Sequence, residues 1–440
     1  METKKIKLEE ALPEEVLVKI FLAGFPLRGI ARLRSVCKGW KSIIDSDCFR
    51  DLYVSLKRLS VSWSIMNNKN PTLSLEIVGH HGCSRWGLTS SLGSWLMRYS
   101  PETTVRKTSV LSCADGLVLL YTETEEGAPM YHVGNPLLQE WVRIPLPPHL
   151  SGYDVVRLQE KRIVFSDSGL VTKMEKGVVV GYKVVWVLPS HNVSKQVDFL
   201  VYSSETGLWE TLEKVRCLYS MIWSRLEHSV PLNGILHWLA ASQNDQDSNY
   251  VACYDFYKGG EECRVIPFPG MTGLERFRRT ITTTAGFLVY CNVFNDDNGG
   301  CTIMVWRLGK KYCDDDANAS WRLSWRLNTN SCESLVGLGV DYFPVVMHPL
   351  YHDVIYLWSR DKDALVLLNF SNRKYGLLKE GSLYRSMDGC LVRLSGCKEY
   401  MDSVYKAYTK ATLVGGGNHF LYFSQFVLPR WLNPLPRLSS

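Results

Sequence analysis

The chain has 440 residues and few of the features that mark a membrane, secreted or disulfide-stabilised protein. No apolar run approaches the roughly 20 residues that a transmembrane helix needs, and the first residues, METKKIKLEEALPEE, lack the apolar core of a signal peptide. Thirteen cysteines occur, but none forms a Cys-x-x-Cys pair. An odd number without framework spacing favours reduced thiols. We therefore expect a soluble protein of the nucleus or cytoplasm, without membrane contact.

A strong excess of one charge sign is also lacking. Lys and Arg number 50 against 44 Asp and Glu, which gives a net charge of +6. Dedicated nucleic-acid binders concentrate far more Lys and Arg on one face, so this balance does not favour nucleic-acid binding. The hydrophobic fraction of 46% and charged fraction of 21% are typical of a folded soluble protein. The length predicts two or three domains, unless one closed β architecture absorbs most of the chain.

Motifs of catalysis and cofactor binding are missing as well. Neither His-Glu-x-x-His, Gly-x-Ser-x-Gly, a phosphate-binding Gly-x4-Gly-Lys-Ser/Thr nor a complete Gly-x-Gly-x-x-Gly occurs. His80, His81 and Cys83 are close enough in sequence for a metal site, but no second ligand pair follows at zinc-finger spacing. A polar loop is the favoured interpretation there. We therefore expect that the protein is not an enzyme and that it has no catalytic residue, cofactor or metal.

What the sequence does contain begins with a helical segment at residues 12–49. Pro13 suits the first turn of a helix. Apolar residues then recur at helical spacing, namely Val16, Leu17, Ile20 and Phe21. A second helix is predicted over Leu27–Leu33 and a third over Val36–Ile44. The segment is too short to bury a core of its own and carries apolar side chains on more than one face, which is typical of a module that docks on a partner.

This segment resembles an F-box. The matching residues are Leu12, Pro13, Glu15, Ile20, Phe21, Leu33, Arg34, Val36, Cys37, Lys38 and Trp40. The resemblance implies docking on the Skp-type adaptor of a cullin-based SCF ubiquitin ligase. The contact residues that it implies are Leu12, Pro13, Leu17, Ile20, Val36, Cys37 and Trp40. Some of these side chains are expected to hold the helices together instead. The alternative is an ordinary helical cap packed on the rest of the chain.

The remainder of the chain predicts a repeated β architecture. From about Ser109 the same phrase returns five times, at intervals of roughly 50 to 65 residues: an apolar strand, a polar loop, and strands that end near Trp, Asp or Asn-Pro. The first strands of the five passes are residues 115–120, 181–187, 233–238, 286–290 and 353–358. This period is typical of a kelch-type β-propeller, in which blades stack around a channel. A pair of β-sandwiches is the alternative.

We predict six blades, with five to seven left open. The sixth would be shared between residues 57–99 and strands at residues 404–428, which would close the ring. The resulting division is a helical F-box domain at residues 8–56 and a kelch-like propeller at residues 57–436. Within the second part, phrases such as Asn135–Trp141, with the pattern Asn-Pro-x4-Trp, resemble the F-box-associated region of large plant F-box families. The Gly-Gly doublets of strict kelch repeats are nearly absent.

Together the two resemblances imply a non-catalytic substrate receptor of an SCF-type ubiquitin ligase. The F-box would bind the adaptor, and through it a cullin scaffold, while the propeller would recruit a protein substrate that the sequence does not name. One alternative is a scaffold or transcriptional co-regulator that uses the same F-box without degradation. Another is a kelch-type propeller that binds a glycan or a small molecule.

Overall fold

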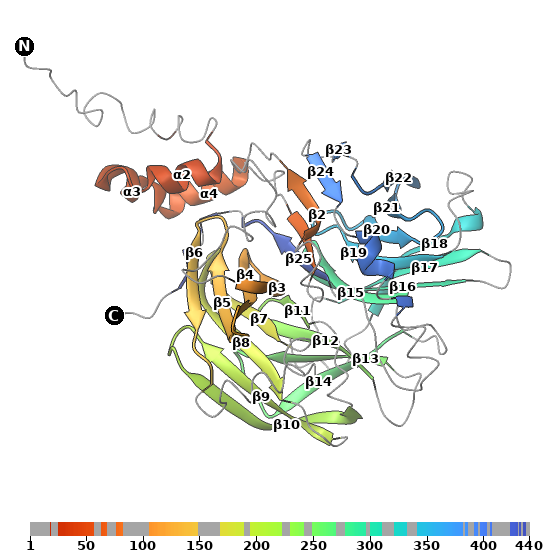
Figure 1. The fold of residues 1–440 in the computed structure, drawn as a ribbon, viewed down its shortest axis with the longest axis horizontal. Helices are drawn as coiled ribbons and strands as arrows, with labels where there is room; N and C mark the ends of the chain where they lie inside the picture. The colour runs from red at the N-terminus through yellow and green to blue at the C-terminus, as the bar shows by residue number, and fades with distance from the viewer. Residues whose placement is uncertain are drawn as a thin grey trace, which may run out of the picture.

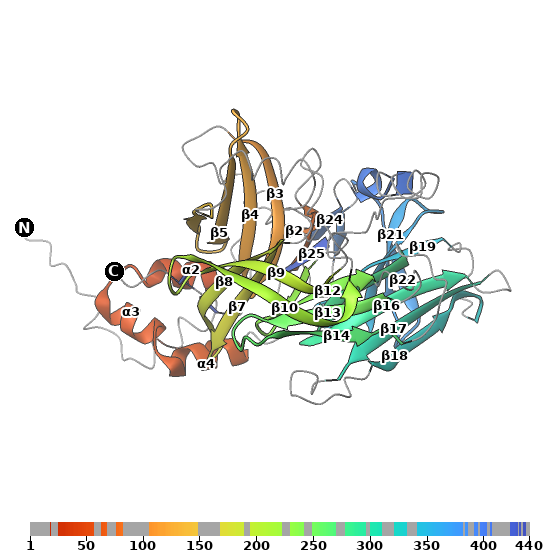
Figure 2. The same ribbon diagram turned by 90° about the horizontal axis from the view of Figure 1, so that it is seen from below.

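A computed structural model of the chain describes residue 18 and residues 25–56, 63–67, 76–81, 105–147, 168–188, 194–221, 229–241, 249–269, 278–295, 300–309, 321–331, 341–381, 383–385, 391–394, 397–402, 405–406, 423–429, 431–432 and 434–436. In both Figure 1 and Figure 2, helices α2, α3 and α4 lie together at one side of a large group of β-sheets. Within these residues, no helix has the length and apolar character needed to span a membrane.

The helical part, called the head below, comprises α2 (Leu27–Leu33), α3 (Lys38–Ile44) and α4 (Asp47–Leu56). The predicted bounds of α2 are confirmed. The prediction for α3 begins two residues too early, because Cys37 is the extended N-cap residue, with φ −154° and ψ 166°. The sequence did not predict α4 as a separate helix.

Three sheets of four antiparallel strands follow the chain order from one edge to the other. The first contains β3 (Val105–Ala114), β4 (Leu117–Thr124), β5 (Pro129–Asn135) and β6 (Glu140–Ile144). The second contains β15 (Arg279–Thr284), β16 (Phe287–Asn295), β17 (Cys301–Leu308) and β18 (Trp321–Asn328), followed by the short helix η5 (Thr329–Ser331). The third contains β19 (Tyr342–Met347), β20 (Val354–Ser359), β21 (Ala364–Asn369) and β22 (Lys374–Leu378).

An eight-stranded sheet consists of two such antiparallel runs joined at their outer edges. One run is β7 (Gly169–Glu175), β8 (Val178–Leu188), β9 (Ser194–Ser203) and β10 (Trp209–Met221). The other is β11 (Ser229–Leu232), β12 (Ile235–Ala241), β13 (Asn249–Asp255) and β14 (Glu262–Pro267). The join is a short parallel pairing in which Arg216 faces Glu262 and Cys217 faces Cys263.

The last sheet combines strands from both ends of the chain. Its order is β23 (Leu383–Arg385), β24 (Leu391–Leu394), β2 (Glu76–His81), β1 (Trp63–Asn67) and β25 (Phe423–Val427). The pairing of β1 with β25, from Trp63 opposite Val427 to Asn67 opposite Phe423, confirms the expected sharing of one sheet between the two ends. Strands β23 and β24 were not predicted to belong to it.

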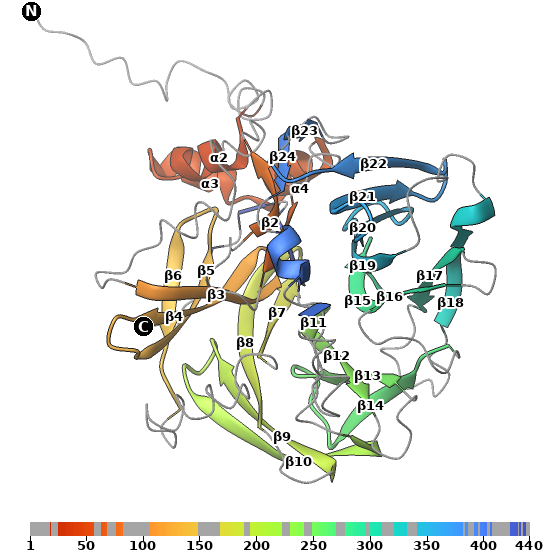
Figure 3. The same ribbon diagram turned by 45° about the vertical axis from the view of Figure 1, so that its right-hand side comes forward.

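One edge strand of each four-stranded run, together with β25, lies towards the middle of the group. These inner strands are β3, β7, β11, β15, β19 and β25, and each contacts the next in a closed circle. Figure 3 shows the first five of them nearest the centre. We call the sheets around this circle the ring. The arrangement is the radial one of the predicted propeller rather than a pair of sandwiches, while the number of blades in the whole chain stays a prediction.

The repeated sequence pattern corresponds to the second, third and fourth strands of each run. It did not include the innermost strand. The inner strands differ in composition: β15 carries four threonines and one aliphatic residue, whereas β19 is aromatic and aliphatic apart from Pro344. In β15, for example, Thr280, Thr282 and Thr284 are all buried. A search for alternating apolar residues does not detect such a strand.

Tight turns join four of the inner strands, β3, β7, β11 and β15, to the next strand on one side of the ring, called the turn face below. Between β3 and β4, Asp115 and Gly116 have φ values of 45° and 81°, as a type I′ turn requires at both central residues. An Asp-Gly pair is a typical sequence for such a turn. Further pairs with two positive φ angles follow β7, β11 and β15, and they are Lys176-Gly177, Asn233-Gly234 and Ala285-Gly286.

Apolar side chains fill the spaces between neighbouring sheets. Around Trp238, for example, Phe199 stacks with the indole at a centroid distance of 5.9 Å and Phe256 approaches it at 6.3 Å. One cluster is different because it joins the ring to the head. Its members from the helices are Leu27, Ile30, Ile44, Phe49 and Tyr53, and those from the first sheet include Val118 and Leu120. The head therefore shares its core with the ring, as expected from its short length.

Candidate functional site

The turn between α2 and α3 carries the described part of the predicted docking site. The residue before α2 is Pro26, whose extended backbone accepts a hydrogen bond from the N–H of Ile30 at 3.1 Å. After α2, the hydroxyl of Ser35 donates to the carbonyl of Arg32 at 2.7 Å. The chain then turns through Val36 and begins α3 at Lys38, where the Sγ of Cys37 accepts from the N–H of Trp40 at 3.4 Å. Local hydrogen bonds thus fix the turn.

The structure places the three described site residues in different environments. Val36 is 64% exposed. Cys37 is half-buried, with its sulfur engaged in the helix cap. Trp40 is half-buried and packs against the cluster shared by head and ring. Val36 therefore faces solvent, while part of Trp40 supports the head. Leu12, Pro13, Leu17 and Ile20 lie outside the described residues.

An ion pair connects the turn to the end of α3. The guanidinium of Arg34 meets the carboxylate of Asp45 through two contacts, Nε to Oδ1 at 2.6 Å and Nη2 to Oδ2 at 3.1 Å. This hydrogen bonding raises the pKa of Arg34 above its usual value. A paired Arg–carboxylate contact fixes geometry as well as charge. Arg34 thus stabilises the turn. The neighbouring cations Lys38 and Lys41 on α3 are exposed.

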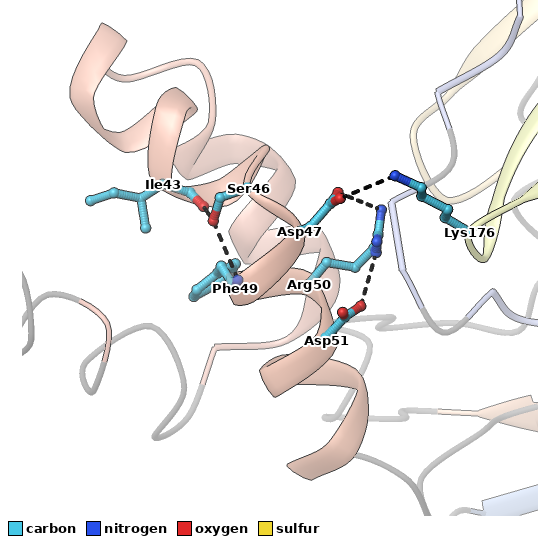
Figure 4. Close-up of polar contacts among 7 residues, drawn as sticks. All are labelled: Ile43, Ser46, Asp47, Phe49, Arg50, Asp51 and Lys176. Carbon is cyan, nitrogen blue, oxygen red and sulfur yellow. Dashed lines mark hydrogen bonds and ion pairs between the residues drawn. The ribbon is translucent and has the colours of Figure 1, made fainter.

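Helix α4 connects the head to the ring (Figure 4). Ser46 caps it, because its hydroxyl accepts from the N–H of Phe49 at 3.3 Å and donates to the carbonyl of Ile43 at 2.7 Å. Arg50 pairs with Asp47 at 3.2 Å and with Asp51 at 3.3 Å. Asp47 also lies 3.9 Å from Lys176 of the ring.

The sequence contained a signal for α4. Ser46 is a preferred N-cap residue, Asp47 suits the first turn, and Phe49 and Tyr53 are spaced four residues apart. Both aromatic side chains are buried against the ring.

A cleft of about 500 Å³ opens on the turn face between α4 and the inner strands. Its lining includes Arg50 and Asp51 from α4, Asp115 and Thr172 from the ring, and Trp431 near the C-terminus. Thr172 donates a hydrogen bond to the Asp115 carboxylate. Burial nevertheless raises the pKa of Asp115 above its usual value, and the Thr172 bond opposes that shift.

The lining of this cleft mixes charged, polar and apolar groups. It combines carboxylates, cationic side chains, two threonines and an asparagine with the apolar surfaces of Met174, Pro429 and Trp431. Convergent polar groups set among apolar walls are typical of a recognition pocket. Within the described ranges, no three His, Cys, Asp or Glu side chains gather as a metal site would require. Strand β2 contains His80 and His81, but their side chains and Cys83 lie outside those ranges.

Comparison with protein families identifies both parts of the chain. Residues 10–55 match the F-box-like family model, and residues 61–437 match the model described as F-box protein At3g26010-like, beta-propeller. The second match covers most of the chain. It agrees with the closed circle of inner strands, and the first agrees with the head.

Curated relatives from Arabidopsis thaliana match along almost the whole length. One is named as an F-box protein, At3g23950, and is 48% identical over 97% of this chain and 98% of its own. The F-box/kelch-repeat protein At1g15680 is 34% identical over 98% and 95%. The F-box protein At3g26010 is 32% identical over 99% and 92%. Among solved structures, a puromycin-hydrolyzing peptidase of Mycobacterium tuberculosis matches 65% of this chain at 10% identity with a TM-score of 0.35, which is too low to bear on function.

Proposed function

Because the chain belongs to the F-box proteins that carry an At3g26010-like β-propeller, we propose that it is the substrate receptor of an SCF-type ubiquitin ligase. In this proposal the head binds a Skp-type adaptor, and through it a cullin, while the ring recruits a protein substrate. The protein would act without chemistry of its own. It would hold the substrate near the ubiquitin-charged enzyme and so raise the effective concentration of the reacting groups.

The observation that supports adaptor docking best is the exposure of Val36. Among the large apolar side chains of α2 and α3, Leu27, Ile30 and Ile44 are buried in the cluster shared with the ring. Leu33, Trp40 and Ile43 are half-buried against the same cluster. An exposed aliphatic residue on a braced turn is free to contact a partner, and buried aliphatic and aromatic anchors carry most of the energy of protein interfaces. The docking face would comprise Leu12, Pro13, Leu17, Ile20, Val36, Cys37 and the exposed part of Trp40.

The compartment that fits this role is the nucleus or the cytoplasm. None of the nine described cysteines forms a disulfide, which agrees with a reducing compartment. The cleft on the turn face offers the ring one surface for a substrate, because it presents both polar and apolar groups next to α4.

The test measures binding of the purified chain to a recombinant Skp-type adaptor by calorimetry. We expect Val36→Glu to weaken binding by at least about tenfold, because it places an unpaired charge in an apolar interface. Leu56→Glu on α4 is the matched control, since Leu56 is also exposed, at 59%, but lies outside the proposed face. A Leu12→Ala/Pro13→Ala double variant examines the other end of the face.

Full binding by Val36→Glu and by the double variant would show that the docking face is wrong. No binding by the wild-type chain, with its fold intact by circular dichroism, would contradict the proposed function itself.

A further inference from the structure

A short C-terminal segment lies between the head and the ring. After β25, the described residues 428–429, 431–432 and 434–436 form neither helix nor strand, and we call them the strap. Their apolar side chains are nevertheless buried, with Leu428, Trp431, Leu432 and Leu435 each 7% exposed or less. An irregular segment of this kind is held by side-chain packing, so its contacts indicate its role.

On the side of the head, the strap contacts α4 through Trp431. The indole lies 5.7 Å from the ring centroid of Phe49 and 5.4 Å from that of Tyr53, at interplanar angles of 65° and 60°. Aromatic pairs favour such edge-to-face and tilted arrangements. Tyr53 also donates its hydroxyl to the carbonyl of Phe25, at 3.3 Å, which connects α4 to the start of α2. Burial raises the pKa of Tyr53 to about 12.

On the side of the ring, the strap is fixed at two further points. Pro429 lies so close to the β3–β4 turn that a Cβ added at Gly116 would come within 2.7 Å of it. The N–H of Leu435 donates to Glu140 Oε2 on β6 at 2.8 Å. Leu435 itself packs in the cluster between the first two groups of strands, with residues such as Leu119 and Tyr182.

The charge of Glu140 also helps to raise the pKa of Arg34 in the head, with a smaller effect than Asp45. The direct ion pair between Asp47 and Lys176 is long, at 3.9 Å, and its side chains are 61% and 81% exposed. Exposed pairs of this kind contribute little. The strap therefore adds aromatic and hydrogen-bonded contacts to the apolar cluster that joins the head directly to the first sheet.

We infer that the strap sets the orientation of the head on the ring, with Trp431 as the positioning residue between α4 and the β3–β6 sheet. The functional consequence of this inference rests on the proposed function. In a ubiquitin ligase, the orientation of the head would decide which lysines of a bound protein face the ubiquitin-charged enzyme. Removal of the indole would leave the docking face and the ring intact. It would, however, allow the head, which carries the docking face, to change its orientation on the ring.

The first measurement is hydrogen exchange of the full-length chain, followed by mass spectrometry. We expect Trp431→Ala to speed exchange in α4 by at least about tenfold, because local opening no longer has to break the aromatic contacts. Exchange in β15–β18, across the ring, should not change. Trp431→Phe keeps an aromatic ring at this position and should restore slow exchange.

Two further variants keep the test decisive if Trp431→Ala proves poorly folded. Glu140→Ala removes the far anchor of the strap without opening a cavity, and it should speed exchange in the head by a smaller factor. Trp325→Ala on β18 is the control, because Trp325 is a half-buried tryptophan that stacks on Phe370, away from the head. It should leave exchange in α4 unchanged.

The second measurement uses a reconstituted ligase and maps which lysines of the receptor itself become ubiquitinated. Trp431→Ala should broaden that set of lysines while its affinity for the adaptor changes less than about threefold, and Trp431→Phe should restore the original set. Unchanged exchange in α4 for both Trp431→Ala and Glu140→Ala would overturn the inference, as would an equal acceleration throughout the ring. A wild-type ligase without ubiquitin transfer would contradict the proposed function, while the exchange data still decide the role of the strap.

Discussion

The head and the ring bury their apolar side chains in different ways. In most of the ring, apolar side chains of neighbouring four-stranded runs pack against one another, as Phe199, Trp238 and Phe256 do. In the head, the buried side chains of α2, α3 and α4 belong to one cluster that also contains residues of the first sheet and of the strap. Small units cannot bury enough surface alone. The ring is thus self-sufficient, and the head depends on it.

The largest expected effect tests whether the head unfolds when the ring unfolds. Trp238 is fully buried in the ring, so Trp238→Ala should lower the free energy of unfolding by about 3–5 kcal/mol. The control Trp238→Phe should cost clearly less, because most of the volume is kept and Nε1 has no hydrogen-bond partner among the described residues. Urea unfolding, followed by circular dichroism, measures both. A head that stays protected from exchange after the ring has unfolded would contradict the dependence.

The converse experiment removes a side chain of the head. Phe49→Ala should cost about 3 kcal/mol in the local stability of the head, since the ring of Phe49 contacts both Tyr53 and Trp431. The ring should keep its melting temperature. Leu52→Ala on the same helix is the control, because Leu52 is 41% exposed and should change little. Hydrogen exchange in α4 reports on the head, and a thermal scan reports on the ring. An equal loss of stability in the ring would contradict the expectation that the ring is stable without the head.

Acid should weaken the ring through its buried histidines. Burial lowers the pKa of His237 to about 4, and that of His132 to about 4 with help from Arg143. The unfolded chain protonates these groups near pH 6.5. It therefore binds more protons than the folded chain between pH 6.5 and 4, and stability falls as the pH drops through that window. His237 alone should cost about 2 kcal/mol at pH 5.

The variant that checks this dependence is His237→Asn, whose amide nitrogen lies near the position of Nδ1. That nitrogen of His237 is 3.1 Å from the carbonyl of Val230. We expect the variant to flatten the pH dependence of the urea midpoint between pH 6.5 and 4. An unchanged slope would show that other groups carry the acid sensitivity.

The smallest expected effect concerns the contact between the strap and the ring. Gly116 and Gly177 both have positive φ, 81° and 77°, so an alanine at either costs about 1 kcal/mol in backbone strain. At Gly116 the new Cβ would also collide with Pro429, while at Gly177 it would meet nothing within 4 Å. Gly116→Ala should therefore cost about 1 kcal/mol more than Gly177→Ala. Equal urea midpoints for the two variants would mean that the strap does not press on this turn.

The sequence was most informative where structure is local. The predicted bounds of α2 agree with the structure to the residue. The sequence was less informative for inner strands such as β15, because its threonines hide the alternation that marks a strand. The contact of Trp431 with Phe49 could not be predicted from the sequence. It joins the two ends of the chain and depends on how the ring closes between β1 and β25.

The same reasons limit what the sequence says about the site. Resemblance named Trp40 as a docking residue, but only the structure shows that it also packs against the shared cluster. Val36 and Trp40 looked alike in the sequence pattern, and their exposure separates them. The cleft beside Asp115 is lined by residues from six separate parts of the chain, so no short motif predicts it.

The most direct test of the account is the hydrogen-exchange footprint of a Skp-type adaptor on the full-length chain. We predict that the adaptor slows exchange in the peptides that contain residues 12–20 and 36–40, while exchange in β7–β22 stays as it is without the adaptor. Protection confined to the ring, or no protection of the head at saturating adaptor, would contradict a head that is held by the ring and open to a partner.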